Sequence, residues 1–181
     1  MTSSASTSGP PGAGRDPIRE AHAQWQRHGW SEAADGMAMV TSVARVHQLL
    51  MERIDAQLRP LGLSFARFEV LRLLSFVRSG SLPMTRLGSL LQVHPTSVTS
   101  AVDRLVKQGY VERRRHADDG RVVLASLTEE GRDVLERATA ALNTEVFEQP
   151  GLPRRDVLAL TRLLAELRAG AGDDVSPDLA R

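Results

Sequence analysis

The side chains best suited to chemistry gather in the stretch from Pro95 to Gln108, where hydroxyl and guanidinium groups recur at short intervals. Ser97, Ser100 and Arg104 follow one another at steps of three and four residues. A helix would place them on one face. Such groups donate hydrogen bonds to phosphate oxygens and to base edges, so this face favours contact with a nucleic acid.

Positive charge is concentrated in the same part of the chain. Residues 94–121 contain six Arg or Lys against four Asp or Glu, a net charge of +2, and the remaining residues sum to −1. The whole chain has 23 basic and 22 acidic residues, which excludes a polybasic coat. Any basic surface must therefore be local. Arg114 and Arg115 are candidates for contacts to phosphate, with a solvated position as the alternative for each.

Other kinds of chemistry lack the residues they require. The chain has no cysteine, which excludes disulfides, thiolate nucleophiles, cysteine-based zinc sites and thiol redox switches. None of the five histidines has another at i+4, and no glycine-rich phosphate loop or spaced nucleophile and base is present. We therefore expect no catalytic residues, no metal and no cofactor. No stretch approaches the roughly 20 apolar residues of a membrane span, so we expect a cytoplasmic protein.

The elements that must position these side chains are two short helices in close succession. The pattern predicts helices at residues 85–91 and 95–108, and the three residues between them are typical of a helix-turn-helix. Val98, Val102 and Leu105 lie on the other side of the second helix. That side should pack, while the polar side stays exposed.

A β-hairpin, or wing, is predicted directly after the second helix, over residues 110–127. Strand-like segments at 110–115 and 121–127 flank Asp118-Asp119-Gly120. Asp-Gly favours a tight turn because both central residues of a type I′ turn need positive φ. Arg121 therefore lies just past the tip of the wing.

Helices are predicted on both sides of this region. The predicted helices cover residues 16–30, which include Trp25, and residues 35–58, 64–79, 129–148 and 154–169. Two segments poor in large apolar residues, 1–15 and 170–181, are expected to be a disordered tail and a flexible tail. The fold class is mainly α with a small β-wing.

The segment from Thr85 to Gly131 resembles the MarR family of bacterial transcriptional regulators. The resemblance rests on Asp119-Gly120-Arg121, on Leu127-Thr128 and Gly131 at the family spacing, and on Asp103-Arg104-Leu105. It implies a MarR-type winged helix domain over residues 35–169. It also implies a homodimer on double-stranded DNA, with residues 35–58, 129–148 and 154–169 as the dimerisation helices.

The resemblance also assigns positions on DNA. The helix at 95–108 would enter the major groove, and Arg121 would reach the minor groove with Asp119 orienting the wing. A solvated helix face or an exposed hairpin arginine is the alternative for single residues. The residues expected to contact DNA are Thr96, Ser97, Thr99, Ser100, Arg104, Lys107, Arg114, Arg115, Asp119 and Arg121.

The additional N-terminal helix is similar to that of the family subgroup that responds to urate and related small organic anions. Trp25 matches the tryptophan of that subgroup, Glu69 stands where it has Asp, and Arg113 matches one of its arginines. Its second arginine aligns with Ala101, which argues against urate itself. The alternatives are a packing role for Trp25 and a plain surface pair for Glu69 and Arg113.

Taken together, the sequence predicts a dimeric repressor. It would bind a pseudo-palindromic operator with half-sites about one helical turn apart and be released by a small aromatic or organic-anion ligand. The alternative is a winged-helix protein-interaction module that does not read DNA.

Overall fold

The computed structural model describes residues 16–91, 95–116 and 121–175, which form two compact units. Unit 1 ends at Leu49 and unit 2 begins at Leu50. Four features predicted above lie outside the described residues: the tail at 1–15, the link at 92–94, the turn at 118–120 that contains Asp119, and the end of the chain from 176.

Unit 1 contains helix α1 (Pro17–Arg27) and the first part of helix α2 (Ser31–Leu58). Asp16 caps α1, as the Asp-Pro pair predicts, because its carboxylate accepts a hydrogen bond from the Ile18 amide at 3.0 Å. Gly29, with φ of +81°, lies in the short link between the two helices. There the rings of Trp25 and Trp30 meet edge to face, with centroids 5.5 Å apart.

Helix α2 begins at Ser31, four residues before the predicted start at Asp35. Glu32 lies in its first turn, where a negative charge interacts favourably with the helix dipole. Asp35 instead lies inside the helix and contacts His22 of α1, with 2.8 Å between its Oδ1 and the imidazole Nε2. A Cβ atom at Gly36 would meet no described atom within 4 Å, so no steric contact requires glycine at this position of α2.

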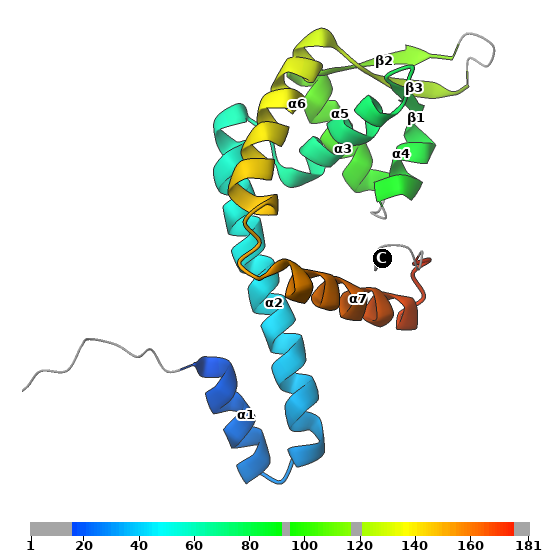
Figure 1. Ribbon diagram of the computed structural model, residues 1–181. Helices are drawn as coiled ribbons and strands as arrows, with labels where there is room; N and C mark the ends of the chain where they lie inside the picture. The colour runs from blue at the N-terminus through cyan, green and yellow to red at the C-terminus, as the bar shows by residue number, and fades with distance from the viewer. Residues whose placement is uncertain (1–15, 92–94, 117–120, 176–181) are drawn as a thin grey trace, which may run out of the picture. The chain divides into compact units, whose positions relative to one another are not determined.

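Unit 2 contains the helix-turn-helix and the wing (Figure 1). Helix α3 contacts α4, α5 and α6, and α4 also contacts α5 and the short strand β1. The elements of this unit after α2 are η1 (Arg59–Leu61), α3 (Phe65–Phe76), β1 (Ser81–Pro83), α4 (Met84–Leu91), α5 (Pro95–Lys107), β2 (Val111–Arg115), β3 (Val123–Leu127), α6 (Glu129–Leu142), η2 (Asn143–Phe147) and α7 (Arg154–Gly170).

The wing is a three-stranded antiparallel sheet in the order β1-β3-β2, whereas the sequence predicts only two strands. The additional strand, β1, pairs Ser81 with Ser126 of β3, and their hydroxyl oxygens lie 2.8 Å apart. Three residues that end in Pro83 have no alternating pattern of their own. Pairing with β3 therefore defines this strand, and proline is tolerated because β1 lies at the edge of the sheet.

The core of unit 2 confirms the predicted packing side of α5. Val98, Val102 and Leu105 are each no more than 2% exposed. They join a single apolar cluster to which α3, both long wing strands and α6 also contribute. The largest fully buried side chains elsewhere in this cluster are Leu58, Val70, Leu71, Leu74, Leu87, Val111, Val134 and Leu142.

The predicted helix at 129–148 is α-helical only to Leu142 and continues as a π-helical segment, η2. Arg53 of α2 stabilises the end of this segment. Its Nη2 donates hydrogen bonds to the carbonyl oxygens of Glu145 and Gln149 at 2.7 and 2.8 Å. These carbonyls lie where a helix leaves acceptors without partners, so the guanidinium satisfies them.

Candidate nucleic-acid interface

Helix α5 carries its polar side chains opposite the buried ones. Ser97, Ser100 and Arg104 are exposed, and so are the three other residues that the sequence assigns to DNA contact on this helix, Thr96, Thr99 and Lys107. Arg104 makes no ion pair within the described residues. Its guanidinium is therefore available for a bidentate contact to guanine or phosphate.

An ion pair joins α5 to the wing. The Nη1 of Arg113, on β2, lies 2.6 Å from the Oδ1 of Asp103, one residue before Arg104. The side chains are 35% and 48% exposed, so solvent screens the pair and its contribution to stability is small. The pair nonetheless fixes the side chain of Arg113, which the sequence assigns to a ligand site.

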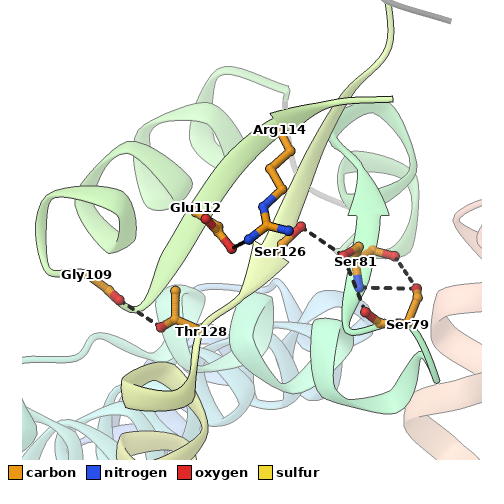
Figure 2. Close-up of polar contacts among 7 residues, drawn as sticks. All are labelled: Ser79, Ser81, Gly109, Glu112, Arg114, Ser126 and Thr128. Carbon is orange, nitrogen blue, oxygen red and sulfur yellow. Dashed lines mark hydrogen bonds and ion pairs between the residues drawn. The ribbon is translucent and has the colours of Figure 1, made fainter. Parts of the chain in front are cut away.

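The two other arginines at the end of β2 are exposed. Arg114 forms an ion pair with Glu112 of the same strand, and Figure 2 shows its side chain turned back toward that carboxylate. The backbone of Arg115 is opposite that of Val123 in the last register pair of β2 and β3. Its charge is balanced by no carboxylate within the described residues, whereas Glu112 partly neutralises Arg114.

Arg121 lies exposed just before β3. The amide of His116 donates to the carbonyl oxygen of Val122 at 2.9 Å, which extends the pairing of β2 and β3 to the edge of the turn. This pairing holds Arg121 at the end of the wing. Asp119, which the sequence assigns to orienting the wing, lies outside the described residues.

The base of the wing is held by polar contacts that the sequence does not predict individually (Figure 2). The Thr128 hydroxyl donates to the Gly109 carbonyl oxygen at 2.7 Å and accepts from the Gly131 amide at 3.0 Å. One side chain thus caps α6 and also binds the turn that follows α5. Ser79 and Ser81 contact each other at the start of β1.

A second polar network connects α5 to the start of α3. The Nη1 of Arg67 donates to Gln108 Oε1 at 3.0 Å, and its Nε donates to Ser64 Oγ at 3.2 Å. Gln108 in turn donates to the Gly62 carbonyl oxygen at 2.9 Å. Arg67 and Gln108 are 41 residues apart, so no local pattern could have revealed this network.

An open hollow of about 680 Å³ lies between these two elements. Its lining residues come from the first turn of α3 and from the polar side of α5, and none of them is acidic. The polar residues of the lining are Ser64, Arg67, Thr96, Ser97, Ser100 and Arg104.

The three residues assigned to a ligand site lie on three elements. Trp25 is on α1 and contacts Trp30, Glu69 is on α3, and Arg113 is paired with Asp103. Burial raises the pKa of the Glu69 carboxyl above its usual value. Glu69 forms no ion pair with Arg113 or with any other described residue, so these two side chains are not a surface pair.

Arg72, also on α3, is a second residue whose pKa is shifted by burial. It hydrogen bonds to Thr139 of α6, and its guanidinium carbon lies 5.8 and 5.5 Å from the ring centroids of Phe68 and Phe76. Burial lowers its pKa, but an arginine remains charged. Its role is to join α3 to α6.

Two absences hold for residues 16–91, 95–116 and 121–175. No helix in that part of the chain is long and apolar enough to cross a membrane. No group of three or more histidine, cysteine, aspartate or glutamate side chains in it is arranged to hold a metal ion.

The fold, together with the exposed polar side of α5 and the wing, defines a winged helix-turn-helix protein. The sequence model of the MarR family matches residues 63–123. The crystal structure of Sco5413, a MarR family transcriptional regulator from Streptomyces coelicolor, is 42% identical, covers 78% of this chain and 99% of its own, and has a TM-score of 0.70. This chain belongs to the MarR family, which is a family of transcriptional regulators and not of enzymes.

Three other relatives differ in how much of their length matches this chain. Sco3205 from Streptomyces coelicolor, solved in complex with DNA, is 26% identical, with a TM-score of 0.68 and coverage of 78% of this chain and 90% of its own. The HTH-type transcriptional repressor Mb2911 of Mycobacterium bovis is 32% identical over 60% of this chain and 77% of its own length. The match to the uncharacterized regulator YhbI of Bacillus subtilis spans 40% of that protein.

Proposed function

We propose that this protein is a transcriptional repressor that binds a pseudo-palindromic operator as a homodimer and is released by a small organic ligand. The observation that carries the proposal is the exposed row of Ser97, Ser100 and Arg104 on a helix whose opposite side is buried. This is the arrangement by which a recognition helix presents donors to the major groove. The DNA complex of the relative Sco3205 and the repressor Mb2911 support the same reading.

The experiment is a fluorescence-anisotropy titration of a labelled operator duplex at physiological salt. Replacing Arg104 by Ala removes a guanidinium from the recognition face and should weaken binding roughly 10- to 100-fold, the equivalent of about 1–3 kcal/mol. Arg137→Ala is the matched control, because Arg137 is an exposed arginine on α6. If the two variants bound the duplex with equal affinity, Arg104 would not be part of the DNA interface.

Exposed apolar side chains support the homodimer. On α2, Met39, Val43 and Val46 are 40–48% exposed, and on α7, Leu163 and Leu167 are 53% and 51% exposed. Rows of exposed large apolar residues mark surfaces that a partner covers. A second copy is the partner proposed here, since two half-sites of a pseudo-palindrome require a two-fold dimer.

The proposed effector is an organic anion that binds Arg113, while Trp25 and Glu69 stay sequence-based predictions as ligand residues. Arg113 already pairs with Asp103, so an anion must compete with that carboxylate. Replacing the carboxylate should therefore change effector affinity and should also loosen the connection between α5 and β2 that positions the wing. Binding of this kind would lower the affinity for DNA through the difference in ligand affinity between the two states.

The measurement is isothermal titration of salicylate and benzoate into the wild type and into Asp103→Asn. The variant removes the competing charge and keeps the side-chain shape, so it should bind the anions several-fold more tightly. Arg113→Ala should abolish the binding, and Trp25→Ala should weaken it. Unchanged affinity in Arg113→Ala would show that the anion binds elsewhere, and unchanged affinity in Trp25→Ala would return that residue to a packing role.

The second candidate function is a protein-interaction module. It would be supported if the wild type failed to bind any duplex at low salt. Arg104 and Arg115 argue against it. Neither forms an ion pair within the described residues, and two exposed arginines beside a helix-turn-helix suit a polyanion.

A further inference from the structure

We propose that the hollow between α3 and α5 is a binding site for a backbone phosphate of duplex DNA, with Arg67 as its principal ligand. This site extends the DNA interface beyond the recognition helix and the wing, and it rests on the proposed DNA-binding function. Neither the helix-turn-helix pattern nor the wing motif includes Arg67.

The charge of the hollow suits a phosphate. Among the described residues of its lining, Arg67 and Arg104 are cationic and none is acidic. Arg67 is held by Gln108 and Ser64, which are neutral, and within the described residues no ion pair cancels its positive charge. Hydroxyl groups of α5 complete the lining, and they can donate to phosphate oxygens as well.

The guanidinium of Arg67 is oriented before any ligand arrives. Its hydrogen bonds to Gln108 and Ser64 engage two of the five N–H donors, and Gln108 is itself fixed by the Gly62 carbonyl. A side chain held in this way loses little rotamer freedom on binding. The remaining donors can form charge-assisted hydrogen bonds to one phosphate group.

The position of the hollow explains why the phosphate would belong to DNA. One wall is the polar side of α5, including Ser97 and Arg104, which the proposed function places in the major groove. A strand that borders the groove must run beside that helix. The hollow is also open and polar, whereas sites for small ligands are mostly enclosed and apolar.

The test uses a labelled 30-base-pair duplex of mixed sequence, because a phosphate contact acts on every sequence. Anisotropy titrations of the full chain between about 50 and 200 mM salt give the affinity and its salt slope. Arg67→Gln removes the charge and keeps a polar side chain that can reach Gln108. We expect several-fold weaker binding and a slope shallower by about one for each Arg67 engaged.

Two companion variants make the result specific. Arg67→Lys keeps the charge, so it should retain most of the slope even though its hydrogen bonds differ. Arg137→Gln removes an exposed arginine from α6 and should leave both quantities unchanged. Thermal unfolding of each variant establishes that the compared proteins are folded. If Arg67→Gln is unstable, Arg67→Met, which also removes the charge and keeps an unbranched side chain, takes its place in the comparison.

Three results would overturn the proposal. If Arg67→Gln matched the wild type in affinity and slope, Arg67 would not contact DNA, and the proposed function would stand. If the wild type bound inorganic phosphate in a calorimetric titration, and Arg67→Gln lost this binding but kept full DNA affinity, the hollow would be a site for a small anion. If the wild type bound no duplex at all, both this site and the proposed function would fail.

Discussion

At the scale of single residues, Gly131 shows how a close contact fixes the base of the wing. A Cβ atom at this position would lie 2.1 Å from the carbonyl oxygen of Tyr110 and 2.9 Å from a methyl carbon of Leu127. The first contact is with backbone, which cannot move without displacing the start of β2. A side chain of any size is therefore excluded here.

Gly131→Ala should lower the free energy of unfolding by about 1–3 kcal/mol, because the added methyl group must displace Tyr110. Urea denaturation followed by circular dichroism measures it. The matched control is Gly88→Ala, since Gly88 lies within α4 and nothing surrounds its would-be Cβ. This control should be neutral or stabilising, in line with the higher helix propensity of Ala. Equal stabilities of the two variants would refute the steric argument.

Glu69 makes stability depend on pH. Desolvation raises the pKa of its carboxyl in the folded protein, so the folded state binds this proton more tightly than the unfolded state does. The stability that this proton contributes is fully present at pH values below the pKa of Glu69 in the unfolded state. It is lost as the pH rises through the pKa of Glu69 in the folded state.

Glu69→Gln should therefore stabilise the protein at pH 7 and have little effect below pH 4, where the wild-type carboxyl is protonated in both states. Urea midpoints across this range measure the difference between the two proteins. A variant less stable than the wild type at pH 7 would show that the charged carboxylate has a favourable partner.

Residues that act through distant partners could not be predicted from the sequence. The apolar repeat of Val98, Val102 and Leu105 predicted their burial, because it depends only on helical periodicity. The bond between Arg67 and Gln108 joins residues on different elements. Likewise the pairing of Arg113 with Asp103 depends on how β2 packs against α5.

At the scale of elements, the local sequence pattern predicts two of the three strands that pair in the wing. Alternation and the Asp-Gly turn predicted β2 and β3, whereas β1 is defined by its register with β3. The end of α6 was also predicted incompletely, because the change to a π-helical segment coincides with hydrogen bonds from Arg53. Long-range contacts therefore decide where these elements begin and end.

The wing should contribute to DNA affinity through Arg121. Replacing Arg121 by Ala removes one cation at the end of the hairpin, which should weaken operator binding and reduce the salt slope by about one per wing engaged. The oligomeric state should not change, because the wing lies outside the helices proposed for dimerisation. Anisotropy titration and light scattering on the same sample separate the two effects. Full affinity in this variant would refute the assignment of the wing.

At the scale of the whole molecule, the proposed homodimer would cover exposed apolar residues of α2 and α7. Leu163→Asp combined with Leu167→Asp places two charges on the exposed apolar side of α7 and should convert the dimer to a monomer, because burying unpaired charges is costly. Light scattering after size exclusion gives the mass. Leu90→Asp, on α4 and 46% exposed, should leave the mass unchanged. A dimer that survives the double substitution would refute the role of α7.

The net charge of +1 is small for a DNA-binding protein, and the homodimer bears on how such a chain can bind DNA. Residues 94–121, with a net charge of +2, offer few phosphate contacts in one copy of the chain, and a two-fold dimer presents the same contacts twice. Affinity should therefore depend on the dimer as well as on single arginines. The monomeric double variant should bind the full operator much more weakly than the wild type does.

In-vitro selection from a pool of random duplexes would show whether this chain reads DNA as a two-fold dimer. The full-length protein is incubated with the pool at physiological salt, and the retained sequences are determined after several rounds. We expect enrichment of an inverted repeat with half-sites about 10 base pairs apart, centre to centre. Failure to enrich any sequence would contradict it.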